Sequence, residues 1–321
     1  MRYSLTSKTK IQRQYKNFVT KILPLKTSGV CRVISRCFAK TVNSMHSDMD
    51  SNAKLRESFD ALLQRFSVDK NALLIQIPQV PPEIIEVEVA HNFGYFAYPP
   101  QGLLYLAAVL DECGISSEIL DLNYHMLQQV KQGVDAQQAW NSELKSKLEN
   151  LTHSLIGVSF MFDTTYPQLK SVCQTIRAQR PDLLIAVGGV AATADPDRIL
   201  QQGLADLVLL NEGETPITQF YKYIVNHSDI LPNNIAFLGE NNQRQTTKEM
   251  TGGEVEIDIR EQYNKLPIRD YHTVGSLNNF SRMRGTNEPY ATVISRRGCR
   301  AKCTFCSVRN FNGKKVRVRD S

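Results

Sequence analysis

Residues 183–189 read Leu-Leu-Ile-Ala-Val-Gly-Gly, and this stretch decides the fold of the chain. A short apolar run that stops at two glycines is typical of a buried β-strand that ends in a tight turn. A similar run, residues 155–160 (LIGVSF), lies upstream, and Pro167 between the two is placed to open a helix at its first turn. Strand, helix and strand in this order predict two parallel strands joined by a helical crossover.

The same alternation extends on both sides of this unit. Helical apolar spacing follows the first predicted strand, and Gly114 is placed to end that helix. Strands are predicted over residues 72–77, 117–121, 155–160, 183–187 and 207–210, and helices over 101–112, 136–149, from Pro167, and over 195–202 and 215–225. This pattern predicts an α/β fold with a doubly wound parallel sheet, whose ligands bind at the carboxyl ends of the strands.

Four regions follow from this reading. Residues 1–70 are predicted to be a basic, disordered N-terminal extension with a short helix over 48–70, and residues 71–238 form the Rossmann-like domain. Residues 239–289 are polar and turn-rich, which indicates a linker that could hold a hairpin. A new strand is expected over residues 290–295 (YATVIS), and it opens the last region, 290–321.

The net charge of +6 over 321 residues is unevenly placed. The first 47 residues hold ten Lys and Arg and no Asp or Glu, which leaves 28 basic against 32 acidic residues in the rest. A basic N-terminal tail followed by a mildly acidic remainder is not the charge distribution typical of a nucleic-acid-binding fold. No nucleic-acid partner is therefore predicted. The tail reads as a disordered or upstream-extended terminus, with an organelle transit segment as the alternative. The longest apolar run, residues 103–110, is too short for a membrane span, so we expect a cytoplasmic protein unless the tail targets an organelle.

Three of the seven cysteines lie within eight residues, in the pattern Cys299-x3-Cys303-x2-Cys306, and the other four are scattered. This distribution indicates a reducing compartment and one metal or cluster site. A closed structural zinc site needs four ligands, and the loop supplies three. Three thiolates on a [4Fe–4S] cluster leave one iron open for an exogenous ligand.

The cysteine loop resembles that of the radical S-adenosylmethionine (SAM) superfamily. The likeness rests on the cysteine spacing, on Phe305 before the last cysteine, and on the flanking stretches 295–298 and 312–319. It implies that Cys299, Cys303 and Cys306 hold a [4Fe–4S] cluster whose fourth iron binds SAM. It further implies reductive cleavage of SAM to a 5′-deoxyadenosyl radical, an electron donor such as flavodoxin or ferredoxin, and a partial (β/α) barrel that begins at the predicted strand 290–295.

The upstream region resembles the cobalamin (B12)-binding domain that precedes the radical SAM barrel in one large subgroup. The likeness is carried by Pro99-Pro100-Gln101-Gly102, Ile119 to Asn123, Gly157 to Ser159, Val187-Gly188-Gly189 and Asn211-Glu212-Gly213-Glu214. It implies a cobalamin site at the carboxyl edge of the sheet, with methyl transfer as the family chemistry. The candidate cofactor-binding residues are Ser159, Gly188, Gly189, Glu212, Gly213 and Glu214.

Two departures from the cobalamin pattern are visible. Asn211 stands where the family usually has the first glycine of Gly-Glu-Gly-Glu. His91 lies in Val89-Ala-His-Asn-Phe-Gly94, without the aspartate that orients a cobalt-ligating imidazole, so we interpret it as a loop histidine. Many radical SAM relatives bind cobalamin without a protein histidine, and some have lost the cofactor.

The chain ends about 30 residues after the start of the predicted barrel strand, whereas a partial barrel needs roughly 200 by analogy with larger (β/α) barrels. We therefore expect the N-terminal portion of a radical SAM enzyme, with no catalytic residue and no substrate identified. Gly252-Gly253-Glu254 precedes the cysteines and is interpreted as a turn, not as a SAM-binding stretch. Alternatives are a non-catalytic corrinoid-binding or docking module with a vestigial cluster loop, and a methylthiotransferase-like enzyme, for which the other cysteines are too scattered.

Overall fold

The computed structural model describes residues 51–152, 154–252, 256–277 and 292–319. The chain divides into two compact units, residues 1–55 and 56–321, and the architecture below is that of the second unit. The predictions of a disordered or targeting tail fall on residues outside the described ranges. The turn predicted at residues 252–254 is described only at Gly252, whose φ is +86°.

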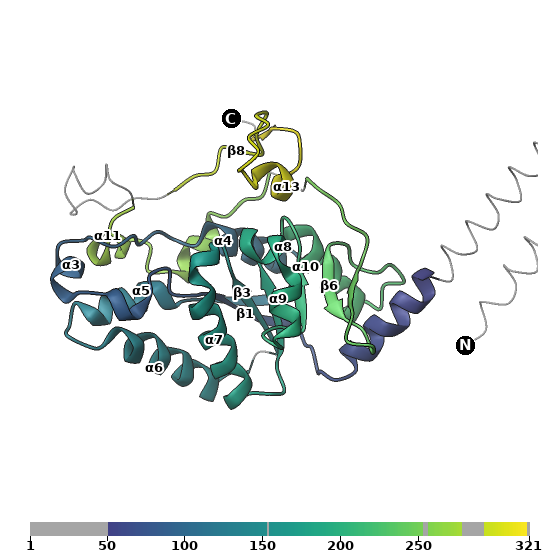
Figure 1. The fold of residues 1–321 in the computed structure, drawn as a ribbon, viewed down its shortest axis with the longest axis horizontal. Helices are drawn as coiled ribbons and strands as arrows, with labels where there is room; N and C mark the ends of the chain where they lie inside the picture. The colour runs from purple at the N-terminus through teal and green to yellow at the C-terminus, as the bar shows by residue number, and fades with distance from the viewer. Residues whose placement is uncertain (1–50, 153, 253–255, 278–291, 320–321) are drawn as a thin grey trace, which may run out of the picture. The chain divides into compact units, whose positions relative to one another are not determined.

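A seven-stranded sheet forms the centre of the fold, in the order β2-β1-β3-β4-β5-β6-β7 (Figure 1). Its strands are β1 (Asn71–Gln76), β2 (Ser116–Asp121), β3 (Leu155–Ser159), β4 (Leu184–Gly188), β5 (Leu207–Leu209), β6 (Ile235–Leu238) and β7 (Arg244–Thr246). The first five strands pair in parallel, which confirms the predicted parallel sheet, and β6 and β7 add an antiparallel edge.

Continuous apolar runs form the central strands because helices cover both faces of a parallel sheet. In β1, residues Ala72 to Gln76 are all buried, so side chains pointing to either face leave water. This double burial explains why the strands read as unbroken apolar runs rather than as alternating ones.

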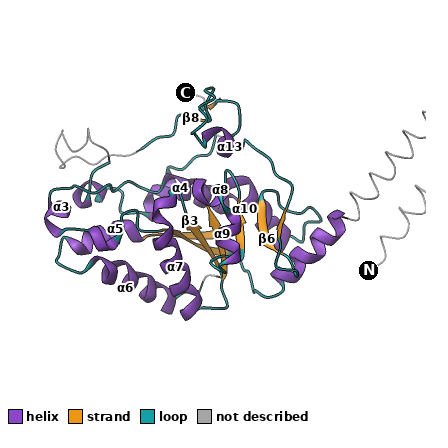
Figure 2. Cartoon of the chain, viewed as in Figure 1, coloured by secondary structure: helices purple, strands orange, loops and turns teal. Residues whose placement is uncertain are grey.

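Helices follow the strands in two layers (Figures 1 and 2). Helix α4 (Gln101–Glu112) packs against α10 (Glu214–Val225), whereas α5 (Leu122–Val130), α6 (Ala136–Glu149) and α7 (Tyr166–Gln179) pack in sequence against one another. Right-handed crossovers in this strand order put these two groups on opposite faces. The doubly wound prediction is therefore confirmed, and the predicted bounds of the helices over 101–112 and 136–149 agree with the structure.

Shorter elements complete the fold. They are η1 (Pro82–Ile84), α3 (Val87–His91), η2 (Asp163–Thr165), α8 (Val190–Ala194), α9 (Pro196–Gln201), η3 (Glu261–Lys265), α11 (Tyr271–Val274) and α13 (Val308–Asn312). The helix predicted over 48–70 is described from residue 51 and ends at residue 63. None of the helices in the described ranges has the length and apolarity that a bilayer span requires.

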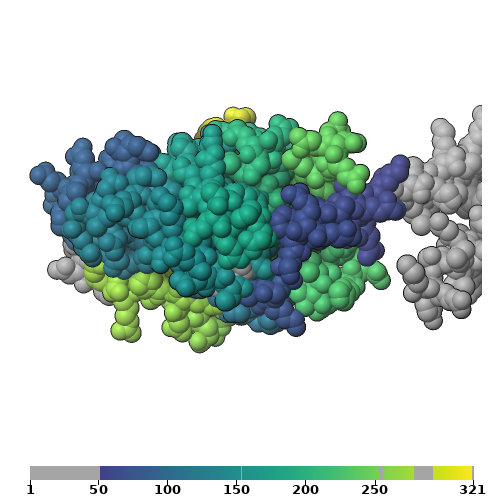
Figure 3. Space-filling model, turned by 90° about the horizontal axis from the view of Figure 1, so that it is seen from below, coloured from purple at the N-terminus to yellow at the C-terminus, as the bar shows by residue number. Residues whose placement is uncertain are grey.

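The stretch predicted as a linker contributes to the body of the fold. The hairpin of β6 and β7 extends the sheet, η3 packs on α4, and α11 packs on α5. Figure 3 shows the lime segment that includes η3 and α11 lying along the blue and teal body. Ile257, Ile259 and Tyr271 are buried there, so apolar side chains hold this segment in place.

The barrel strand predicted over residues 290–295 is absent from its described part, residues 292–295. The two-residue strand β8 (Arg296–Arg297) follows instead, and it pairs antiparallel with β9 (Arg317–Val318). In this stretch the Thr292 carbonyl accepts hydrogen bonds from two side chains, the Tyr263 hydroxyl at 2.8 Å and the Gln101 amide, and not from a neighbouring strand. The described residues therefore show no part of a (β/α) barrel.

Candidate functional site

The carboxyl ends of the parallel strands form one row of neighbouring residues. In this row Gln76 of β1 lies beside Asp121 of β2 and Ser159 of β3, and Ser159 lies beside Gly188 of β4. In-register residues of parallel strands share a face, and small side chains at Ser159 and Gly188 leave that face open. The row therefore marks the edge at which sheets of this type bind ligands.

A cavity of about 510 Å³ opens at this edge. Its floor is the sheet face that carries Leu74, Gly157 and Ala186, and its opposite wall comes from Leu103 of α4 and Ile217 of α10. Small-molecule sites are typically apolar clefts of roughly 300–1,000 Å³ with a few polar groups. The size and the mostly aliphatic lining of this cavity fit that class.

All six residues predicted to bind a cofactor line this one cavity. They come from the ends of β3 and β4, from the loops after β4 and β5, and from the first residue of α10: Ser159, Gly188, Gly189, Glu212, Gly213 and Glu214. Residues up to 55 positions apart in the sequence thus meet because parallel topology gathers the strand ends at one edge.

Gly188, the last residue of β4, and Gly189, which follows it, differ in the space around them. Gly189 has φ +118°, and a Cβ there would lie 2.4 Å from the backbone oxygen of Phe160, so only glycine fits. Gly188 has room, because its Cβ would lie no closer than 3.6 Å to Leu209. Gly189 therefore shapes the turn, and Gly188 keeps the cavity floor low.

Asn211 takes the place of the glycine that the resemblance would lead one to expect. It has φ +61°, in the left-handed region that asparagine tolerates better than most residues. Its backbone N–H donates to Thr193 Oγ1 at 2.9 Å, and the residue is buried. The substitution therefore keeps the backbone conformation of a glycine at this turn.

Glu212 and Glu214 are buried and bind arginines of the cysteine-bearing segment, residues 292–319. Glu212 Oε2 accepts from Arg317 Nη1 at 2.8 Å, and Glu212 Oε1 accepts from Asn312 Nδ2 at 2.7 Å. Glu214 forms an ion pair with Arg297 at 2.5 Å. Both carboxylates thus hold this segment against the edge of the sheet, beside the cavity.

Arg297 is the central cation of this network. Burial by itself lowers the pKa of its guanidinium, but the carboxylates of Glu214 and Glu212 outweigh burial and raise that pKa above its ordinary value. The guanidinium also stacks over the ring of Tyr105, 4.5 Å from its centroid. Arg297, with Phe311 and Asn312, lines the roof of the cavity, so the ion pairs also determine how the cavity is covered.

The three predicted cluster ligands lie on the loop between β8 and α13. Cys303 and Cys306 are exposed, Cys299 is partly exposed, and the N–H of Cys306 donates to the carbonyl of Cys303 at 3.3 Å. Within the described residues, no group of three or more His, Cys, Asp or Glu side chains is close enough to hold a metal ion. Three thiols are suitable ligands for an iron–sulfur cluster, but in this structure they do not lie close enough together to bind one metal centre.

Two polar side chains that the motifs did not indicate also line the cavity, Gln76 and Tyr98. Burial, with a smaller contribution from Asp121, raises the pKa of Tyr98. Gln76 was missed because it ends an apolar strand without any motif, and only its register beside Ser159 reveals its place.

Neither His91 nor His125, which follows Asp121 in the sequence, lines the cavity. His91 ends α3 and is exposed, and His125 lies on α5 with its Nε2 3.9 Å from Glu143. No histidine lines the described part of the cavity. The interpretation of His91 as a loop histidine agrees with this arrangement, although the residue ends a short helix.

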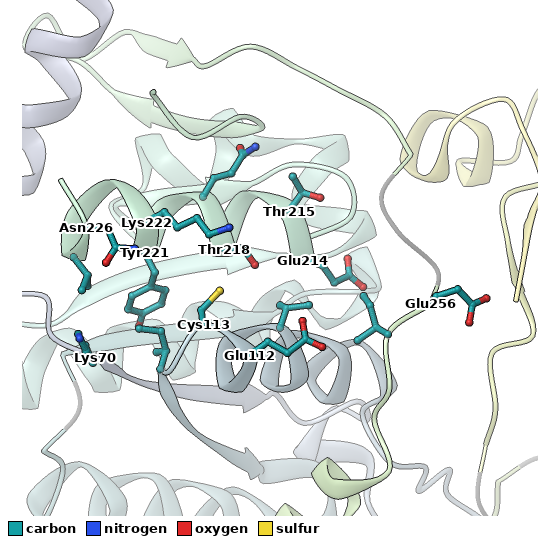
Figure 4. A pocket seen from close by; sticks show the side chains of 15 residues that line it. Lys70, Glu112, Cys113, Glu214, Thr215, Thr218, Tyr221, Lys222, Asn226 and Glu256 are labelled. Carbon is teal, nitrogen blue, oxygen red and sulfur yellow. The ribbon is translucent and has the colours of Figure 1, made fainter. Parts of the chain in front are cut away.

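A second cavity, of about 590 Å³, lies along α4 and α10 (Figure 4). Cys113 at the end of α4 and Thr218 of α10 face it, together with charged side chains of both signs, among them Lys222 and Glu112. Glu214 is the motif residue that reaches this cavity. Its mixed lining indicates no particular ligand class, so the cavity at the sheet edge is the candidate site.

The family model of the B12 binding domain matches residues 90–220. Cytidylyl-2-hydroxyethylphosphonate methyltransferase of Streptomyces wedmorensis is 26% identical over 247 residues, which cover 68% of this chain and 46% of that protein. Hopanoid C-3 methylase of Methylococcus capsulatus is 23% identical over 225 residues, which cover 68% of this chain and 38% of that protein. The chain thus spans less than half the length of these curated relatives.

Solved structures share the fold. The radical S-adenosylmethionine methyltransferase TsrM from Kitasatospora setae aligns with a TM-score of 0.54 at 15% identity, covering 78% of this chain and 43% of that one. The cobalamin-dependent S-adenosylmethionine radical enzyme OxsB aligns with a TM-score of 0.50 at 17% identity, covering 77% of this chain and 29% of that one. At sequence identities of 15% and 17%, this structural similarity shows that the chain shares their fold.

Proposed function

We propose that this chain, which carries a B12-binding domain and is distantly homologous to cobalamin-dependent radical SAM methyltransferases, binds a corrinoid in the cavity at the carboxyl edge of its sheet. The observation that supports this most directly is the convergence of the six motif residues on one cavity. The matched family region, residues 90–220, contributes all six of them.

The residues present fit a corrinoid. Gly157, Ala186 and Gly188 add no large side chain to the sheet face beside Leu74, and Leu103 faces it from α4. A corrinoid is larger than this cavity, so the cavity receives part of it. Because no histidine lines the described part of the cavity, the proposal is binding without a histidine ligand to cobalt.

We extend the proposal to the reaction class of the relatives, radical SAM methyl transfer. In that class a bound cobalamin supplies the methyl group. Cys299, Cys303 and Cys306 would hold a [4Fe–4S] cluster that binds SAM, and a flavodoxin or ferredoxin would supply electrons. The contribution of this chain's own side chains is to position: Glu212 and Glu214 hold the cysteine-bearing segment beside the corrinoid cavity.

A second candidate function is a corrinoid-binding or docking module without catalysis. The observation that favours it is the arrangement of the cysteines, which are exposed and are not gathered into a ligand group. Iron distinguishes the two functions. If the chain is part of an enzyme, it should hold about four irons per chain after anaerobic reconstitution, and Cys303→Ala should lose them. If it is a docking module, it should bind a corrinoid but no stoichiometric iron.

The corrinoid proposal is tested by filling the cavity at Gly188. Gly188→Ala and Gly188→Leu add side chains where a Cβ has room, so the backbone is not strained. We expect hydroxocobalamin bound to the full chain, measured by its visible spectrum after gel filtration, to fall slightly in the Ala variant and at least tenfold in the Leu variant. Equal binding by all three proteins, each with unchanged circular dichroism, would place the corrinoid elsewhere.

A further inference from the structure

Asn312 is followed by Gly313, and this pair is the only Asn-Gly sequence in the 321 residues of the chain. The backbone nitrogen of the next residue can attack an asparagine side chain, and a glycine there has no side chain that would obstruct the approach. Among the described residues the N–H of Gly313 has no hydrogen-bond acceptor, so no bond has to break before this nitrogen reacts. The pair therefore combines a nucleophile and an amide that it can attack.

The Asn312 amide helps to hold the cysteine-bearing segment against the sheet edge. Its Nδ2 donates to Oε1 of Glu212 at 2.7 Å, and its backbone carbonyl accepts from Arg317 Nη2 at 3.0 Å. Glu212 is 6% exposed, whereas Asn312 is partly exposed. The amide thus lies between a buried carboxylate of the domain and the surface of the segment.

Few contacts keep the segment closed around Asn312. The residue is the last of α13, a helix of five residues of which none is buried. The neighbouring strands β8 and β9 have two residues each. Regions with few buried apolar contacts open locally at a low cost in free energy. In such an open state the carboxamide leaves Glu212 and becomes available to the Gly313 nitrogen.

A carboxylate at position 312 would upset the balance of charge at this edge. Among the described residues, the carboxylates of Glu212 and Glu214 face the guanidinium groups of Arg297 and Arg317. A third carboxylate would place an oxygen where the Asn312 nitrogen now lies, 2.7 Å from Glu212 Oε1. Two carboxylates at this distance cannot both stay ionised, and burial strengthens their repulsion. Loss of the amide therefore disfavours the closed position of the segment.

We infer that Asn312 is a site of spontaneous deamidation, and that the carboxylate formed there releases the cysteine-bearing segment from the sheet edge. The nitrogen of Gly313 forms a bond to Cγ of Asn312, and the bond between Cγ and Nδ2 breaks. The proton of the Gly313 N–H passes through water to the departing Nδ2, which leaves as ammonia. Water then opens the succinimide ring at either of its carbonyls, and the product is aspartate or isoaspartate.

The release runs in one direction, because water does not restore the amide. The three cysteines lie on the segment, so the reaction moves the predicted cluster ligands away from the cavity at the sheet edge. This modification goes beyond the proposed function and needs neither a bound corrinoid nor a bound cluster. Its failure would leave the corrinoid proposal untouched.

The first measurement follows both asparagines of the tryptic peptide 310–314 while the full chain is incubated at mildly alkaline pH. Asn310 is the internal control, because it is exposed and belongs to the same segment but precedes Phe311. Fragment ions in peptide mass spectrometry show at which residue the amide has become an acid. We expect Asn312 to deamidate at least tenfold faster than Asn310. Equal rates at the two positions would overturn the assignment of the site.

The second measurement tests the release of the segment. Asn312→Asp supplies the product in advance, and amide hydrogen exchange in β8 and β9 should become about tenfold faster while exchange in β1 stays unchanged. Asn310→Asp adds the same charge at an exposed position of the segment and should leave all three strands at the wild-type rate. Wild-type exchange in Asn312→Asp, or the same acceleration in Asn310→Asp, would overturn the release.

Aged wild-type protein answers the same question if Asn312→Asp does not fold. Anion-exchange chromatography separates the deamidated chains by their added negative charge, and their hydrogen exchange is compared with that of the fresh chain. Faster exchange in β8 and β9 supports the release, and unchanged exchange contradicts it.

Discussion

The parallel-sheet domain and the cysteine-bearing segment, residues 292–319, are stabilised by different forces. In the domain, large apolar side chains such as Ile75 and Phe237 are completely buried. In the segment, Val293 and Phe305 are 76% and 91% exposed, and the two strands have two residues each. The segment instead binds the domain through arginines that pair with Glu212 and Glu214.

This difference indicates that the segment can be displaced without a loss of stability in the domain. Apolar burial is non-directional and accumulates over many contacts, so it resists the loss of any one of them. A buried ion pair depends on both partners, because removing one leaves an uncompensated charge. Changes to a few charges should therefore move the segment and leave the domain folded.

The largest expected contrast between the two regions is in thiol reactivity. Burial raises the pKa of Cys173 in α7 to about 12, so only about one part in 10⁴ would be thiolate at pH 8. Cys303 and Cys306 are exposed. We expect iodoacetamide to label these two at least 10³ times faster than Cys173, as measured by peptide mass spectrometry. Similar rates would mean that the domain opens as readily as the segment.

A core truncation should destabilise the domain strongly. The ring of Phe237 in β6 is fully buried, with its centroid 5.0 Å from that of Phe59. Phe237→Ala should lower the free energy of unfolding in urea by about 3–5 kcal/mol. The matched truncation Phe305→Ala in the segment should change it by less than about 0.5 kcal/mol. A comparable loss from Phe305→Ala would show that the segment shares the core.

Loss of one carboxylate should release the segment. Glu212→Gln removes the charge that pairs with Arg317 and lies 3.8 Å from Arg297, which keeps its ion pair with Glu214. Arg317 loses its carboxylate partner and can hydrate fully only if the segment moves away. We expect amide hydrogen exchange in β8 and β9 to speed up about tenfold or more, equivalent to a local loss of at least about 1.4 kcal/mol. Exchange in β1 should stay unchanged.

The control for this variant is Glu240→Gln, at an exposed position near the β6–β7 turn. It removes the same charge without touching the segment and should leave exchange in β8 and β9 at the wild-type rate. If β1 loses protection together with β8 and β9 in Glu212→Gln, the two regions are one cooperative unit and the comparison fails.

The smallest expected effect concerns Asp121 and pH. Burial raises the pKa of this carboxyl above its ordinary value, against the lowering effect of its hydrogen bond from Tyr271. The folded state therefore holds the proton more tightly than the unfolded state, and this stabilisation is present below the ordinary pKa and is lost as pH rises through the folded pKa. Asp121→Asn should remove this dependence of the unfolding free energy on pH. Because a single proton is involved, the dependence cannot exceed about 1.4 kcal/mol per pH unit.

Urea unfolding of the wild type and Asp121→Asn between pH 4 and pH 8 measures this effect. The stability of the wild type relative to the variant should fall as pH rises. Hydrogen exchange in β8 and β9 should not follow this titration, because Asp121 pairs with α5 and α11 and not with the segment. If the stability of the wild type relative to the variant instead rose with pH, Asp121 would be stabilised as the carboxylate.

Much of the fold was predictable from local patterns. The five parallel strands and the helices α4 and α6 were placed within a few residues because apolar runs and helical spacing record burial directly. Helix α5 was missed, since its first turn follows β2 without a break and depends on Asp121 as its N-cap. The predicted barrel strand is not found in its described part, residues 292–295, because a stretch rich in β-branched residues becomes a strand only if neighbouring strands pair with it.

The sequence by itself determined the parallel sheet, the convergence of the motif residues on its carboxyl edge, and the cysteine spacing. Only the tertiary structure decided that Glu212 pairs with Arg317, 105 residues away, and that Gln76 lines the cavity. The reason is physical: periodicity reports which residues are buried, because burial repeats along a helix or strand. The choice of partner for a buried charge or amide depends on distances between segments remote in sequence, which no local pattern records.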